Sequence, residues 1–104
     1  MPTINYNKLV RDKIPEIIED SGKTCKWEVL PDEEFIEMLN IKLHEEVNEY
    51  LETGSVEELV DINEVIKAII ECKGVSKEEI EDIGLKKLET KGGFKKRILL
   101  KSVD

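Results

Sequence analysis

Residues 42–61 read KLHEEVNEYLETGSVEELVD, and this stretch decides the fold because it joins two strongly periodic segments through a short break. Seven of its twenty residues are acidic. Four of these acids form two pairs, Glu46/Glu49 and Glu58/Asp61, in which the partners are three residues apart and lie on a predicted helix. The stretch is therefore either a solvated charged surface or a set of carboxylates that face inward and hold a metal.

The periodicity outside this stretch predicts a mainly helical chain. The residues TGS at 53–55 separate two helices, and the remaining turns carry further glycines and helix caps. We expect a helix from near Pro15 to just before Gly22, one over about 33–52 with Asp32 as its N-cap, one from the Ser55 cap to about Lys73 and Gly74, and one from the Ser76/Glu79 capping box to Lys91. Residues 24–30 and 94–100 are expected to be extended.

The fold class that follows is all-α, a bundle of about four helices in a single domain over residues 1–104. At 39% hydrophobic residues in 104, the core is thin, so oligomerisation is a natural way to gain buried area. The net charge of −8 argues against binding to nucleic acid or to an anionic membrane. No apolar run reaches the length of a membrane span, and no signal-peptide pattern opens the chain, so we expect a cytoplasmic protein.

Helix phase distinguishes the paired acids from the other acids. On a wheel of 100° per residue, Glu46 falls inside the apolar arc of its helix and Glu49 lies at the edge of that arc. Glu58 and Asp61 occupy equivalent positions on the next helix. The remaining acids of the stretch are expected to face solvent: Glu45, Glu52 and Glu57.

A buried carboxylate must be protonated, paired with a cation or bound to a metal. Oxygen-only ligation suits Mg²⁺ or Mn²⁺, and helical bundles build such sites from carboxylates on facing helices. The same spacings also arise by chance in a chain with 38% charged residues, and Ser55-x-x-Glu58 reads equally well as a capping box. Spacing and phase alone leave both interpretations open.

The order Glu46-x-x-Glu49, short loop, Glu58-x-x-Asp61 resembles the all-α nucleotide pyrophosphohydrolase superfamily. The flanking segments YNKLVRDKIPEII and KGGFKKRILL are similar to its small branch of MazG-like and phosphoribosyl-ATP pyrophosphohydrolase-like proteins. The resemblance spans nearly the whole chain. It implies helical subunits that associate as dimers or tetramers, with a four-helix bundle around each active site.

The resemblance also implies an activity, which is Mg²⁺-dependent cleavage of a nucleoside triphosphate to the monophosphate and pyrophosphate, in a house-cleaning role. Carried over by position, the metal ligands would be Glu46, Glu49, Glu58 and Asp61, with Mn²⁺ as an alternative ion. The ions would lower the pKa of a bound water, and one carboxylate would act as the general base, which the sequence does not single out.

An anionic substrate needs basic partners, and basic residues gather near both ends of the chain. The predicted substrate contacts are Lys8, Arg11, Lys13 and Arg97, each of which is equally well explained as ordinary surface charge. Lys42 is placed to pair with Glu46 one turn later. The competing function is a non-catalytic module of the same fold, which oligomerises or binds a nucleotide without hydrolysing it.

Overall fold

The computed structural model describes residues 3–4 and 6–104, and in this part of the chain all regular structure is helical. The described residues form four helices: α1 over Ile14–Asp20, α2 over Asp32–Thr53, α3 over Val56–Cys72 and α4 over Lys77–Lys91. The described residues form no strand: residues 24–30 have no regular structure, and the extended backbone expected at 94–100 is interrupted by a turn from Phe94 to Arg97. The all-helical prediction and the approximate helix boundaries are thereby confirmed.

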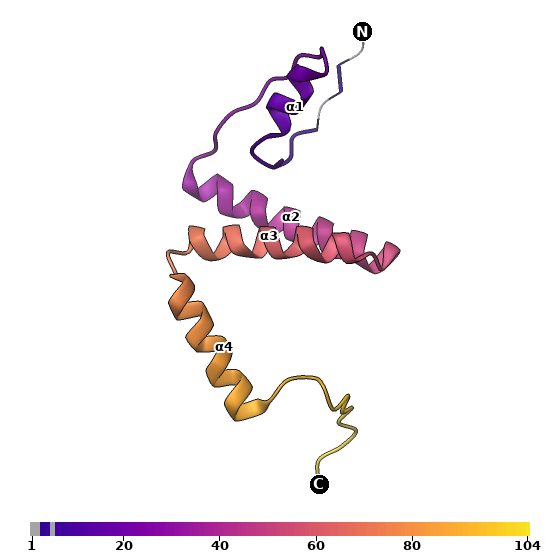
Figure 1. Ribbon diagram of the computed structural model, residues 1–104, viewed down its shortest axis with the longest axis vertical. Coiled ribbons are helices and arrows are strands. Elements are labelled where there is room, and N and C mark those ends of the chain that lie inside the picture. The colour runs from indigo at the N-terminus through magenta and orange to yellow at the C-terminus, as the bar shows by residue number, and fades with distance from the viewer. Residues whose placement is uncertain (1–2, 5) are drawn as a thin grey trace. The chain divides into compact units, whose positions relative to one another are not determined.

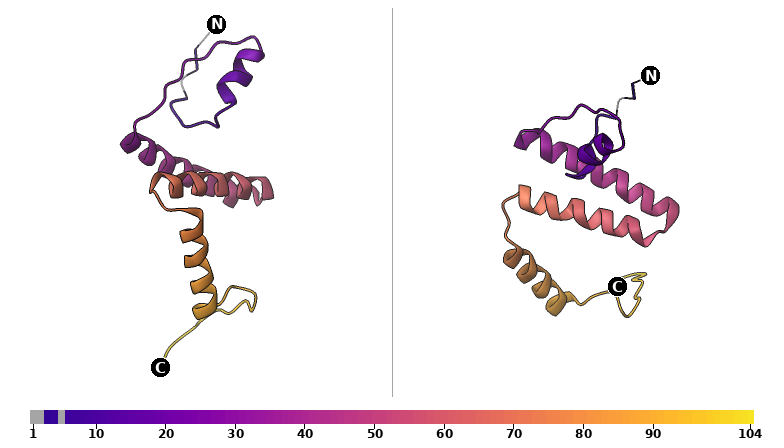
Figure 2. Two further views of the ribbon diagram at one scale, coloured as in Figure 1. Left: turned by 60° about the vertical axis from the view of Figure 1, so that its left-hand side comes forward. Right: turned by 45° about the horizontal axis from the view of Figure 1, so that its top comes forward.

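The chain divides into two compact units, residues 1–73 and 74–104, and each is described by itself. In the first unit, α2 and α3 pack side by side along most of their lengths (Figures 1 and 2). Because only two residues separate these helices, they run antiparallel. This hairpin brings the start of α3 back alongside the end of α2, where the paired acids lie.

The tight connection between α2 and α3 depends on two residues with distinct physical roles. Gly54 adopts φ 65°, the left-handed conformation that glycine reaches without strain, and its N–H donates to the Tyr50 carbonyl at 2.7 Å. Ser55 then caps α3, with its Oγ accepting from the Glu57 N–H at 3.2 Å. The Ser55 cap predicted from the sequence is thereby confirmed.

The N-terminus of α2 differs from the sequence prediction. Asp32 was expected to be the N-cap, but Pro31 occupies that position with an extended backbone, and Asp32 is the first helical residue. The Pro31 carbonyl accepts the first helical bond, from Phe35 N–H at 2.9 Å. Asp32 instead contributes a negative charge to the first turn, where it interacts favourably with the helix dipole.

The buried core of the described chain is small. Two hydrophobic side chains of the described chain are buried, Leu39 on α2 and Val65 on α3. Many large apolar side chains on the same two helices stay exposed: Ile41, Leu51, Val56, Leu59, Val60 and Ile66. Two buried hydrophobic residues supply little of the free energy that offsets the entropy of folding.

The second unit consists of α4 and the segment that follows it. Ser76 caps α4, and its Oγ accepts from the Glu79 N–H at 3.1 Å, as the capping-box pattern predicted. Gly92 ends the helix with φ 81°. A turn follows, closed by the Arg97 N–H donating to the Phe94 carbonyl at 3.1 Å. Among the described helices, none is both long and apolar enough to cross a membrane.

Candidate metal centre

The α2–α3 hairpin brings together the four carboxylates that the sequence singled out. Carboxylate oxygens of Glu46, Glu58 and Asp61 lie within 4.8 Å of one another, so one cation could contact all three. Glu46 also belongs to a second such group, with Glu45 and Glu49 on its own helix. Glu46 is thus the centre of a continuous acidic cluster, defined here as Glu45, Glu46, Glu49, Glu58 and Asp61.

Glu46 is the most buried acid of this cluster, with 6% of its surface exposed, as its place in the apolar arc predicted. Its Oε1 pairs with Lys42 Nζ at 3.3 Å, one helical turn earlier. Its Oε2 is buried and has no hydrogen-bond partner in the described chain. An unpartnered buried carboxylate oxygen is costly, so a proton, a water molecule or a cation at this atom would stabilise the folded chain.

Glu58 presents a second oxygen of the same kind. Its Oε2 is buried and without a hydrogen-bond partner among the described residues. The pKa of Glu58 is raised above its usual value, first by desolvation and then by the negative charge of Glu49, with smaller contributions from Glu46 and Asp61. The Glu49 carboxylate therefore lies close enough to Glu58 to disfavour its ionised form.

The chemistry of this donor set suits a hard divalent cation. Glu46 and Glu58 each have a buried oxygen for which the described residues supply no hydrogen-bond partner, and both belong to a cluster that offers oxygen ligands only. A cation bound among these carboxylates would relieve the repulsion that raises the pKa of Glu58. The residues present therefore fit Mg²⁺ or Mn²⁺.

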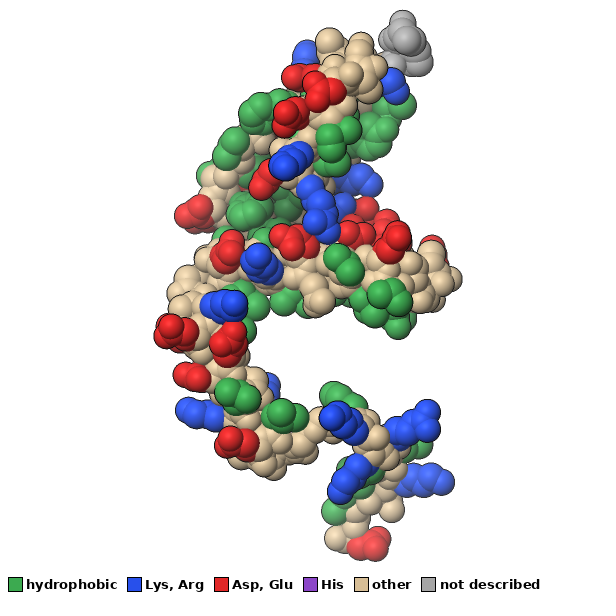
Figure 3. All heavy atoms as spheres, in the orientation of Figure 1, with side chains coloured by type: hydrophobic (Ala, Val, Ile, Leu, Met, Phe, Trp, Pro, Cys, Tyr) green, Lys and Arg blue, Asp and Glu red, His purple; other side chains and the backbone are tan. Residues whose placement is uncertain are grey.

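The N-terminal segment supplies two cations to the same cluster. Lys8 Nζ lies 3.2 Å from Glu45 Oε1, and the guanidinium of Arg11 donates to Asp61 Oδ1 at 2.8 Å. Figure 3 shows blue basic side chains meeting red acidic ones where the N-terminal segment approaches α2 and α3. These contacts place Lys8 and Arg11 beside the carboxylates, although they are 37 and 50 residues from their partners in the sequence.

The other two predicted substrate contacts are Lys13 and Arg97, and among the described residues Lys13 forms no hydrogen bond or ion pair with the cluster. Lys13 precedes α1 as its N-cap residue and is exposed. Arg97 lies in the second unit, beside Phe94. For both residues, a substrate contact stays a prediction.

Sequence reasoning missed Glu45. The helix wheel placed this residue on the solvated face with Glu52 and Glu57, and those two are indeed exposed. The Glu45 side chain is only 29% exposed, because it lies against both Lys8 and Lys42. The wheel describes one helix and carries no information about the N-terminal segment that covers this face. The only signal available was the basic cluster near residue 8, which had no assigned acidic partner.

Comparisons with known proteins give no functional information. No protein-family model and no solved structure matches the chain. One curated relative, an uncharacterized protein of Mycolicibacterium smegmatis, is 50% identical over 42 residues. That match covers 40% of this chain and 43% of the relative, so it does not define a family.

Proposed function

We propose that this protein is a Mg²⁺-dependent nucleotide pyrophosphohydrolase of the all-α, MazG-like kind, which cleaves a nucleoside triphosphate to the monophosphate and pyrophosphate. The observation that carries the proposal is a pair of buried oxygens, Glu46 Oε2 on α2 and Glu58 Oε2 on α3, for which the described residues supply no hydrogen-bond partner. The ExxE and ExxD motifs that resemble the superfamily are the ones that supply these two side chains.

In this proposal, Glu46, Glu49, Glu58 and Asp61 hold the cation. When bound, Mg²⁺ neutralises phosphate charge and lowers the pKa of a coordinated water. The chain's own residues then position the substrate. Lys8 and Arg11 are exposed enough to exchange their partners Glu45 and Asp61 for phosphate oxygens, since surface ion pairs contribute only about 0–1 kcal/mol. The carboxylate that takes the proton from water is one member of the cluster.

The small core supports the second half of the proposal, which is that the protein acts as a homo-oligomer, either a dimer or a tetramer. On α2 and α3, apolar side chains such as Leu51 and Val56 are more than 70% exposed. Exposed apolar faces of this kind are typical of interfaces between chains, and covering them with another α2–α3 hairpin gives a four-helix bundle around the acidic cluster. Sedimentation equilibrium tests this part of the proposal, and a monomer at micromolar concentration would contradict it.

The activity is tested by incubating the protein with a panel of NTPs and dNTPs and measuring pyrophosphate release with and without Mg²⁺. We expect release on at least one nucleotide, no release in EDTA, and loss of at least about a thousandfold in rate for Glu46→Ala with Glu58→Ala. The matched control is Glu52→Ala with Glu57→Ala, which removes two exposed acids from the same helices. Equal activity of the two double variants would sink the proposal, as would an inactive wild-type protein.

A second candidate function is supported by the ion pairs of the cluster. Lys8, Lys42 and Arg11 already place three cations beside Glu45, Glu46 and Asp61, so part of the cluster's charge is balanced within the chain. This favours a non-catalytic module that binds a nucleotide through the same basic residues, or only oligomerises. Titration calorimetry separates the two, because binding without turnover and without dependence on Mg²⁺ would support the module.

A further inference from the structure

The segment that follows α4 differs in charge from the rest of the chain. Residues 91–103, which begin with the last residue of α4 and are named here the C-terminal basic segment, contain five Lys and Arg residues and no acid, and the acidic Asp104 follows them. The first unit, residues 1–73, carries eighteen Asp and Glu against eight Lys and Arg, a net charge of −10. The two charges are complementary, and charge complementarity across a surface steers association and sets its register.

The C-terminal basic segment also presents apolar side chains to solvent. Phe94 is 97% exposed, and Ile98, Leu99, Leu100 and Val103 are each at least 75% exposed. Aromatic and aliphatic side chains interleaved with Lys and Arg are typical of a docking segment, in which apolar anchors supply affinity and charges supply specificity.

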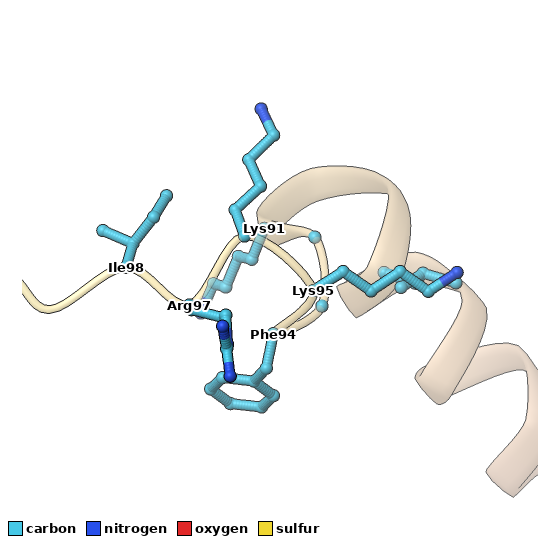
Figure 4. A pocket seen from close by; sticks show the side chains of 9 residues that line it. Lys91, Phe94, Lys95, Arg97 and Ile98 are labelled. Carbon is cyan, nitrogen blue, oxygen red and sulfur yellow. The ribbon is translucent and has the colours of Figure 1, made fainter.

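The C-terminal basic segment contains a turn near its start. Arg97 has a left-handed backbone with φ 58°, and this conformation accompanies the turn that its N–H closes onto the Phe94 carbonyl. Figure 4 shows the Arg97 side chain beside the Phe94 ring, at a hollow that Leu88 and Lys91 also line. The turn therefore holds an aromatic ring and a guanidinium side by side on the surface.

We propose that the C-terminal basic segment of one chain docks on the acidic first unit of a second copy of this chain. A second copy of this chain is the expected partner because its first unit is strongly acidic. That unit also exposes apolar side chains, such as Tyr6, Trp27 and Val29, which the apolar side chains of the segment can contact. A segment of ten irregular residues spans up to about 33 Å, enough to extend over a neighbouring subunit.

Docking of the C-terminal basic segment is independent of the proposed activity. It is also independent of the proposed interface between α2–α3 hairpins. A homo-oligomer held together only by α2–α3 faces would leave the C-terminal basic segment without a role in assembly. The docking proposal instead makes association depend on that segment's charge, and therefore on salt.

The first test is site-specific photo-cross-linking of the full chain, with p-benzoylphenylalanine in place of Phe94. A mixture of ¹⁴N- and ¹⁵N-labelled copies is irradiated, and the cross-linked peptides are identified by mass spectrometry. We expect position 94 to be joined to peptides from residues 1–73 that carry the other label. Cross-links only within one label, cross-links to residues 74–104, or no cross-links at all would overturn the proposal, as would preferential cross-linking to an added oligonucleotide.

The second test is sedimentation velocity of Lys95→Glu with Lys96→Glu, against the control Lys86→Glu with Lys87→Glu. Both variants change the net charge by the same amount at exposed lysines, and the control pair lies on α4. We expect the first variant to raise the dissociation constant between chains about tenfold or more at 50 mM salt, with the difference shrinking at 500 mM. Equal association of the two variants would overturn the docking proposal but would not contradict the proposed α2–α3 interface.

Discussion

The ion pair between Lys42 and the buried Glu46 makes a quantitative prediction. Replacing Lys42 by Met keeps the aliphatic stem of the side chain but removes its charge. At the observed separation of 3.3 Å, the attraction is about 5 kcal/mol for an effective dielectric constant of about 20. Lys42 is 22% exposed and regains hydration when the pair is broken, so the net loss is smaller. We expect Lys42→Met to lower the free energy of unfolding by about 1–3 kcal/mol at pH 7.

The measurement is urea denaturation followed by circular dichroism at 222 nm, in low salt with EDTA. The matched control is Lys67→Met on α3, an exposed lysine with no ion pair recorded among the described residues, for which we expect a change within about 0.5 kcal/mol. If the loss in Lys42→Met reflects an uncompensated Glu46 carboxylate, then Mg²⁺ should restore more stability to this variant than to the control. An effect of Lys42→Met no larger than that of Lys67→Met would refute the reasoning.

Three further predictions concern the cluster and the connection between α2 and α3. Glu58→Gln should raise the stability of the metal-free protein at pH 7. Because the pKa of Glu58 is raised in the folded state, the stability that its protonated carboxyl contributes is fully present below the unfolded pKa and is lost as pH rises through the folded pKa. Denaturation between pH 4 and 8 in EDTA checks this, and an unchanged pH profile would contradict it. Ser55→Ala removes the α3 cap and should cost about 1 kcal/mol of unfolding free energy in the same urea assay, whereas Ser102→Ala, outside the helices, should cost nothing measurable. Gly54→Ala places a side chain at φ 65° and should lower the melting temperature by several degrees, since the strain is about 1 kcal/mol; a stabilised protein would show that this connection is not left-handed in solution.

Local rules were sufficient to predict the helices from the sequence. The TGS break, the Ser55 and Ser76 caps and the glycines after each helix depend on backbone conformations that neighbouring residues decide, and the observed helices follow them to within a residue or two. Asp32 is the exception: proline before it provides an extended residue whose carbonyl begins the helix, so the aspartate lies one position inside.

The sequence also determined that Glu46 faces inward on α2, because helix phase is a local property, although it did not show that Glu45 is partly covered. The burial of Glu46 follows from its place among apolar residues at helical spacing. Only the tertiary structure decided that Glu58 and Asp61 lie within reach of Glu46, and that Lys8 and Arg11 contact this cluster across 37 and 50 residues of chain. Those contacts depend on the path of the irregular segments before α2, which no periodicity encodes. The acidic stretch at residues 42–61 thus specified the candidate carboxylates by itself, whereas their convergence and their cationic neighbours came from the fold.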